Sequence, residues 1–177
     1  MRRVLSLAKV YALMEPGPVV LVTSARGGGA NVMPMSWHMM VEFEPPWIAC
    51  VISDRNHTFE TVRATRECVI AIPTVDIAAQ VVACGNCSGR DVDKFGTIGL
   101  TPEPGAVVEA PLVAECYANL ECRLVDARMV RRYNLFVWEV KQAWIDPHNR
   151  HPRTIHHLGY GKFMVSGPTI RLASRMR

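Results

Sequence analysis

The sequence predicts a mainly β-sheet domain of the α+β class, in which antiparallel strands are joined by a few connecting helices. The apolar residues between Cys116 and Leu124 alternate with polar ones, the period-two pattern of a half-buried antiparallel strand. Pro18–Thr23 and Trp47–Ile52 are short β-branched apolar runs bounded by Gly, Pro or Asp, which predicts strands buried on both faces. Such strands belong in a barrel or beneath a helix.

Composition limits the class of protein. The chain has 177 residues, of which 49% are hydrophobic and 20% charged, so we expect one compact domain over residues 1–177 rather than a disordered chain. Its formal charge of +4 comes from scattered basic residues and forms no stripe of the kind that nucleic-acid binders need. No apolar stretch approaches the roughly 20 residues of a membrane span. We therefore predict neither nucleic acid nor a membrane as a partner.

The N-terminus and the cysteines indicate the compartment. Val4–Met14 is apolar but is interrupted by Lys9, and no clear cleavage site follows it, so we expect a short docking helix rather than a signal peptide. Most of the six cysteines lie in apolar runs, where a free thiol packs as a small hydrophobic group. This pattern predicts a reducing, cytoplasmic location.

The other segments extend the sheet and add helices. Residues 30–43 follow the turn Gly27–Gly29 and predict a hairpin-linked meander. Asn134–Ile145 predicts a long strand, and Thr58–Arg66 and Val75–Cys84 predict connecting helices. In the long strand we expect one face to carry Phe136, Trp138, Val140 and Trp144.

One connection is long. Residues 86–111 are rich in Gly and Pro, and a connection of this length in a compact domain usually has a function. We expect them to cover a ligand or to contact a second copy of the chain.

Three motifs follow one another in a fixed order. They are Asn31-Val-Met-Pro-Met-Ser-Trp37, Glu44-Pro-Pro46 and Ser53-Asp-Arg-Asn-His-Thr58. This order resembles the flavin reductase-like family, and flavoredoxins in particular. The resemblance continues through Ser88–Phe95 and His156–Phe163 and covers nearly the whole chain. It implies an antiparallel split β-barrel that binds FMN non-covalently.

FMN carries a dianionic phosphate, which needs hydrogen-bond donors, and a flat ring, which needs an apolar slot. Thr58 stands where a helix begins, so the free amides after it and its hydroxyl are candidates to hold the phosphate, with Arg55 and Ser53 adding donors. From the residues alone, a plain N-cap threonine and a solvated turn arginine explain the motif equally well.

The resemblance also implies contacts with the flavin ring. Trp37 and Phe163 would line the ring, and Lys94 would place a cation near its N1 and O2 edge, where it would stabilise the reduced form. Without the resemblance, the aromatic residues would be core residues and the lysine a surface residue. The implied cofactor-binding set is Asn31, Met33, Pro34, Met35, Ser36, Trp37, Ser53, Arg55, His57, Thr58, Lys94, Phe95 and Phe163.

Two further motifs receive little weight. The glycines at Gly27–Gly29 lack the spacing of a dinucleotide fingerprint and precede a strand-like segment, so a hairpin turn is the better interpretation. Cys84 and Cys87 have the spacing of a zinc or dithiol pair, but nearby histidines fit no structural pattern. His157 is expected at the surface or behind the flavin contacts.

We therefore expect an FMN-binding oxidoreductase with no catalytic side chain and no metal. It would either reduce flavin with NADH or NADPH or carry electrons for a redox protein partner, as flavoredoxins do, and the resemblance implies a homodimer. An alternative from another class is a non-enzymatic module that holds haem or a metal through His148–His157 and Cys84/Cys87. The choice between NADH and NADPH, the electron acceptor and the role of the cysteine pair stay open.

Overall fold

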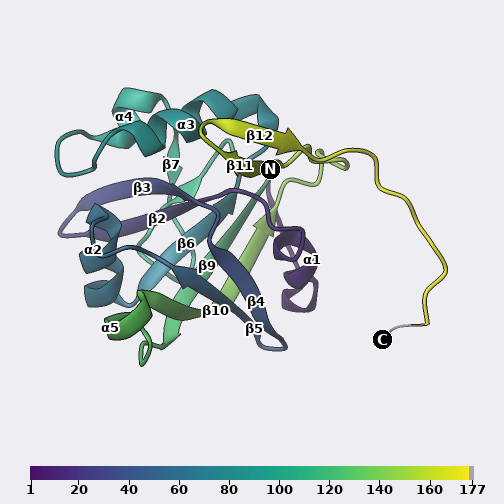
Figure 1. Cartoon of the computed structure of the whole chain (residues 1–177), viewed down its shortest axis with the longest axis horizontal. Coiled ribbons are helices and arrows are strands. Elements are labelled where there is room, and N and C mark those ends of the chain that lie inside the picture. The colour runs from purple at the N-terminus through teal and green to yellow at the C-terminus, as the bar shows by residue number, and fades with distance from the viewer. Residues whose placement is uncertain (176–177) are drawn as a thin grey trace.

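A computed structural model of the chain describes residues 1–175 (Figure 1). The strands are β1 Arg3–Val4, β2 Val20–Arg26, β3 Gly29–Met35, β4 His38–Phe43, β5 Pro46–Val51, β6 Glu67–Ile72, β7 Pro102–Glu103, β8 Leu112–Val113, β9 Ala118–Asp126, β10 Leu135–Ile145, β11 Ile155–Gly159 and β12 Lys162–Val165. The helices are η1 Leu7–Lys9, α1 Tyr11–Met14, α2 His57–Thr65, η2 Val75–Ile77, α3 Ala78–Asn86, α4 Lys94–Ile98 and α5 Val130–Tyr133.

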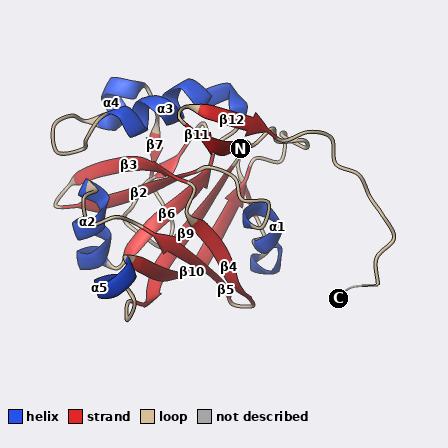
Figure 2. Ribbon diagram, in the orientation of Figure 1, coloured by secondary structure: helices blue, strands red, loops and turns tan. Residues whose placement is uncertain are grey.

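One antiparallel sheet organises the molecule. Its strand order is β3-β2-β6-β9-β10-β5-β4, and β1 pairs with β10. The two edge strands, β3 and β4, follow each other in the chain, so the sheet is split where the chain passes from one edge to the other. Figure 2 shows the sheet curved, with α3 and α4 above it, α2 on one side and α1 on the other.

The tight hairpin between β2 and β3 confirms the predicted glycine turn. Arg26 pairs with Gly29, and the two residues between them, Gly27 and Gly28, have φ values of 60° and 82°. Both central residues of this turn thus need positive φ, which glycine adopts without steric cost.

The sheet separates two hydrophobic cores. Val20 and Val22 point into the first core, inside the curved sheet, whereas Leu21 points into the second, beneath α3 and α4. The β2 run is therefore buried on both faces, as its composition predicts. In β5, Ile48 and Cys50 also join the first core.

The first half of the predicted half-buried strand, β9, is buried on both faces. Its apolar residues face the first core, and Asn119 and Glu121 on the other face are also fully buried, whereas Arg123 is exposed as predicted. The prediction of a solvated face is therefore wrong for Asn119 and Glu121, because residues 103–113 fold over them. The Glu121 carboxylate accepts hydrogen bonds from the backbone amides of Ala106, Val107 and Val108 and from Trp144 Nε1.

A register shift in β10 overturns the predicted placement of Trp144. Phe136, Trp138 and Val140 lie in the first core as expected. Between Val140 and Gln142 the pairing with β9 shifts, as at a β-bulge, and the side chains beyond it change face. Ala143 therefore enters the first core, and Trp144 packs against the second.

The predicted loop over residues 86–111 contains structure of its own, because α4 and β7 lie within it. Near the N-terminus, the expected docking helix is broken into the short elements η1 and α1, with Val10 and Met14 buried in the first core. Residues 166–175 extend away from the sheet in Figure 1. None of the helices within residues 1–175 is long and apolar enough to cross a membrane.

Candidate functional site

Three hollows run along the edge strand β3 and gather most of the predicted site residues. The β3–α2 hollow, of about 390 Å³, includes Asn31 and His57. The β3–α5 hollow, of about 500 Å³, includes Ser53 and the residues Met33, Pro34, Met35, Ser36 and Trp37. The β3–α3 hollow, of about 280 Å³, shares Pro34, Met35 and Ser36 with it and adds Phe163. The end of β3 and the residue after it thus form a wall that two of the hollows share.

The β3–α2 hollow contains buried polar groups without partners. Asn31 is 7% exposed, and its Nδ2 donates a 2.9 Å hydrogen bond to Thr58 Oγ1 while its Oδ1 has no partner. If the Asn31 amide were flipped, so that Oδ1 and Nδ2 exchanged places, only one of these two atoms would still be bonded. Ser24, opposite Asn31 in the β2–β3 pairing, is fully buried, and its Oγ is also unpartnered. Buried polar atoms of this kind are costly unless a ligand or water completes them.

Gly89 closes this hollow at a position that only glycine fits. A Cβ atom built on Gly89 would lie 2.1 Å from Asn31 Oδ1 and 3.0 Å from Cδ2 of His57. Any side chain here would therefore collide with the unpartnered amide. The close approach keeps the backbone of residues 88–90 beside the start of α2.

Positive charge and free amides surround the start of α2. The helix begins at His57, and the amides of His57 and Thr58 precede the first bonded one, in which Phe59 N donates to the carbonyl oxygen of Asn56. Arg90 Nη1 donates to the carbonyl oxygen of Arg55, which holds the two basic residues together, and the Arg55 amide donates to Ser53 Oγ. Thr58 is buried within the first turn, and its Oγ1 accepts a hydrogen bond from Asn31 Nδ2, which leaves the hydroxyl hydrogen able to donate to a ligand.

Lys94 and Phe95 lie behind β3 and line none of the three hollows. Phe95 packs in the second core. Lys94 is only 5% exposed, and its Nζ donates a 2.7 Å hydrogen bond to the carbonyl oxygen of Cys84. No carboxylate among residues 1–175 pairs with this buried ammonium group.

The β3–α3 hollow has both apolar and polar residues in its lining. Its wall combines Phe163 with residues of α3, and the Phe163 ring lies 5.4 Å from the ring of His157. His157 is exposed, as expected, and it also lines this hollow. Trp37, by contrast, is 72% exposed and stands on the rim of the β3–α5 hollow.

Several lining residues escaped the sequence prediction. Arg132, Tyr133 and Asn134 reach the β3–α5 hollow from α5 and its C-cap, and Asn56 joins them. Only the pairing of β10 with β5 brings Arg132, Tyr133 and Asn134 beside β3, and no local pattern marks them, whereas Asn56 lies within the Ser53–Thr58 motif. Arg90, by contrast, lies in a motif that the sequence does single out.

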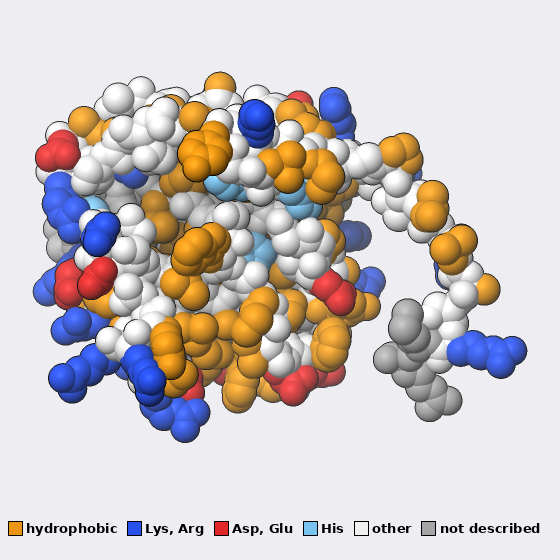
Figure 3. Space-filling view, viewed as in Figure 1, with side chains coloured by type: hydrophobic (Ala, Val, Ile, Leu, Met, Phe, Trp, Pro, Cys, Tyr) orange, Lys and Arg blue, Asp and Glu red, His pale blue; other side chains and the backbone are white. Residues whose placement is uncertain are grey.

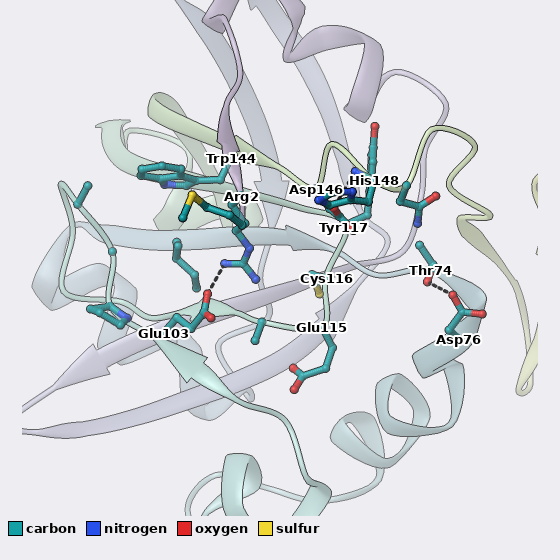
Figure 4. A pocket seen from close by; sticks show the side chains of 17 residues that line it. Arg2, Thr74, Asp76, Glu103, Glu115, Cys116, Tyr117, Trp144, Asp146 and His148 are labelled. Atoms are coloured by element: carbon teal, nitrogen blue, oxygen red, sulfur yellow. Dashed lines mark hydrogen bonds and ion pairs between the residues drawn. The ribbon is translucent and has the colours of Figure 1, made fainter.

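A larger cavity lies elsewhere and contains none of the predicted site residues. It has a volume of about 840 Å³ and is shown in Figure 4, where Arg2 faces Glu103 and Thr74 faces Asp76. Arg2 and Glu103 form an ion pair of 2.9 Å. Other carboxylates of this cavity are held by local hydrogen bonds, and we regard it as separate from the hollows along β3.

The residues of the metal or haem alternative do not converge. His148 lines the large cavity, whereas His157 faces the β3–α3 hollow. Burial raises the pKa of the Cys84 thiol to about 11, an effect that Lys94 partly offsets. Within residues 1–175 there is no group of three or more His, Cys, Asp or Glu residues that could hold a metal ion.

A split antiparallel barrel of this strand order, with polar and apolar hollows along one edge strand, defines the class of FMN-binding split barrels. The family model described as "Flavin reductase like domain" matches residues 13–163. The chain belongs to this family.

Relatives and solved structures agree with this assignment. The chain is 36% identical to an uncharacterized protein, YddH, of Escherichia coli K12 over 89% of this chain and 91% of that protein. An FMN-binding domain of a flavin reductases-like enzyme from Shewanella baltica has a TM-score of 0.92 at 29% identity, with 98% of each chain covered. Flavoredoxin of Desulfovibrio vulgaris has a similar fold, with a TM-score of 0.79 at 24% identity over 89% of this chain and 90% of that one.

Proposed function

We propose that the chain binds FMN non-covalently along β3 and acts as an oxidoreductase. The observation that carries this proposal is the unfinished polar site at the start of α2. There the buried Asn31 Oδ1 lacks a partner, and Gly89 is packed against it without room for a side chain. We also propose that residues 1–177 act as one domain, because one sheet supports all three hollows.

The phosphate end of FMN fits the start of α2. A helix of nine residues presents free amides and a partial positive charge at this end. Arg55 and Arg90 are held together beside it, and Ser53 follows the end of β5. These groups supply the charge-assisted hydrogen bonds that a phosphate needs.

The ring end fits the apolar walls beyond it. Met35 and Ser36 border both the β3–α3 and the β3–α5 hollow, and Phe163 lines the first. FMN, when bound, supplies hydride and single-electron chemistry. The chain would position the ring, keep part of it dry and hold the buried positive charge of Lys94 behind β3, where it favours a nearby anion.

The electron source divides the proposal into an enzyme and a carrier. A flavin reductase accepts a hydride from NADH or NADPH, whereas a flavoredoxin-like carrier exchanges electrons with a redox protein. We favour the reductase, because the β3–α5 hollow is open beside the proposed ring position and its rim is basic. Stopped-flow mixing of FMN-loaded protein with NADH or NADPH separates the two, since these dinucleotides would reduce the FMN of a carrier only slowly.

A homodimer is part of the proposal. The edge strand β4 and the residue before it expose the alternating row Trp37, Met39, Val41 and Phe43. Figure 3 shows hydrophobic side chains gathered on this face. An apolar row on a free strand edge is self-complementary, so a second copy related by a two-fold axis would cover it.

Absorbance spectroscopy tests the proposed cofactor. Protein soaked in excess FMN and then desalted should keep flavin absorbance bands that dithionite bleaches. Protein that stays colourless after this treatment would contradict the proposal. The six free cysteines, five of them buried, support the further proposal of a cytoplasmic location, where thiols stay reduced.

A further inference from the structure

We propose that Arg132 binds a phosphate group of a nicotinamide dinucleotide in the β3–α5 hollow. This inference rests on the proposed FMN function and names the substrate contact of the same site. It concerns a residue that neither the sequence motifs nor the fold assigns to the flavin.

The charge of the hollow favours an anion. Arg132 is the basic residue of its wall, and no Asp or Glu among residues 1–175 lines it. Figure 3 shows Lys and Arg side chains gathered over α5 and the nearby end of the molecule. A hollow lined by one sign of charge raises the local concentration of oppositely charged ligands.

Arg132 is available for such a ligand. Its guanidinium carbon lies 5.2 Å from the centre of the Tyr133 ring, and no carboxylate in the described part of the chain pairs with it. Arg128, four residues earlier, is by contrast held by Asp126. The backbone that carries Arg132 is anchored, because Ile52 donates its amide to the carbonyl oxygen of Asn134 and so ties the end of α5 to the end of β5.

The depth of the groups separates a resident cofactor from a passing substrate. The proposed FMN contacts Asn31 and Thr58 are buried, whereas Arg132, Tyr133 and Trp37 are exposed at the rim. A cofactor that stays bound occupies the inner groups, and a molecule that arrives later meets the outer ones. The exposed Tyr133 ring offers a face for a flat base, and the arginine offers donors for phosphate.

The test compares two neighbouring arginines of one short helix. Arg132→Ala removes the proposed contact, and Arg131→Ala removes an equal charge that does not line the hollow. In FMN-loaded protein, Arg132→Ala should raise KM for the dinucleotide roughly tenfold, the loss expected for one charge-assisted hydrogen bond. Arg131→Ala should change KM by less than about twofold, as a screened surface charge does.

Two binding measurements accompany the kinetics. Calorimetric titration of NADP⁺ and NAD⁺ into FMN-loaded protein should show the same loss of affinity in Arg132→Ala and partial rescue in Arg132→Lys. The FMN dissociation constant should be unchanged in all variants. A loss of affinity for NADP⁺ alone identifies its 2′-phosphate as the partner of Arg132. An equal loss for NADP⁺ and NAD⁺ identifies the pyrophosphate that both carry.

Three results would overturn the inference. One is an unchanged KM in Arg132→Ala. Another is an equal rise of KM in Arg131→Ala, which would mean that the net charge of α5, and not a contact of Arg132, attracts the dinucleotide. The third is weakened FMN binding in Arg132→Ala, which would assign the guanidinium to the flavin. If the wild-type protein retains FMN but neither binds nor oxidises a dinucleotide, the inference fails and the FMN proposal stands. Failure to retain FMN would defeat the proposed function itself.

Discussion

Asn31 Nδ2 donates a 2.9 Å hydrogen bond to Thr58 Oγ1, which fastens the edge strand β3 to the first turn of α2. In this bond Thr58 Oγ1 is the acceptor, and Asn31 Oδ1 is left unpartnered next to the backbone of Gly89. The two motifs that sequence analysis assigns to the flavin thus meet in space. At their meeting point, Asn31 Oδ1 can accept a hydrogen bond from a hydroxyl group of FMN, whereas the phosphate needs the donors at the start of the helix.

Gly89→Ala should reduce FMN affinity without unfolding the protein. The new methyl group would meet Asn31 Oδ1 at 2.1 Å, so the 88–90 segment must move away from the start of α2. We expect at least a roughly tenfold rise in the FMN dissociation constant, equivalent to about 1.4 kcal/mol. Fluorescence titration with FMN measures it.

Gly167→Ala is the matched control for this substitution, because a Cβ there meets nothing within 4 Å. Its FMN affinity should equal that of the wild type. Equal affinity in both variants would mean that the Asn31–Gly89 contact does not shape the cofactor site.

Glu121→Gln should destabilise the fold. The buried carboxylate accepts three backbone amides and Trp144 Nε1, and an amide side chain would turn an NH₂ group toward donors. We expect a loss of about 2–4 kcal/mol in the free energy of unfolding. Urea unfolding measures it, with the exposed Glu15→Gln as the control. A loss below about 0.5 kcal/mol, the usual size of a surface change, would contradict this account of residues 103–113.

The alternation in β9 and the bulge in β10 show what a sequence can and cannot predict. Period two correctly locates β9, but whether its polar face meets water depends on a distant segment that covers Glu121. In β10, one shift in the register reverses the faces after Val140, and no residue of the run announces it. Local patterns therefore predict elements better than the surroundings of their side chains.

The candidate site follows the same rule. Motifs locate Asn31 and the start of α2, because helix starts and polar clusters have local signals. The motif locates Lys94, but its side chain faces the carbonyl oxygen of Cys84 behind β3. This orientation depends on tertiary packing and has no local signal. Arg132 has no motif, since the pairing of β10 with β5 brings it to the hollow.

His38 should make stability depend on pH. Burial lowers the pKa of its imidazole, against an opposing hydrogen bond from Nε2 to the carbonyl oxygen of Pro18. The unfolded chain then binds more protons, so stability falls as pH drops below the ordinary value of 6.5 and levels off below the folded pKa. The slope is at most about 1.4 kcal/mol per pH unit.

Urea unfolding of wild type and His38→Gln between about pH 5 and pH 8 checks this prediction. The variant should have a flatter acid limb, whereas His151→Gln, at an exposed position, should follow the wild type. Parallel profiles for wild type and His38→Gln would show that another group sets the pH dependence.

Val41→Lys should weaken the proposed dimer. Val41 is 46% exposed within the apolar row of β4, and a lysine there would place like charges opposite each other in a symmetric pair. Sedimentation analysis should show a shift to monomer. Val125→Lys, at a 39% exposed position on β9, should leave the oligomeric state unchanged. A monomeric wild type would remove the basis of this prediction.

The most direct test of the account is an equilibrium titration of the ligand-free protein with FMN, followed by the fluorescence of the flavin. We predict saturable binding of one FMN per chain, weakened in Asn31→Ala and in Gly89→Ala. A titration that never saturates, with no shift of the melting temperature in excess FMN, would contradict the central claim that β3 and the start of α2 form a flavin site.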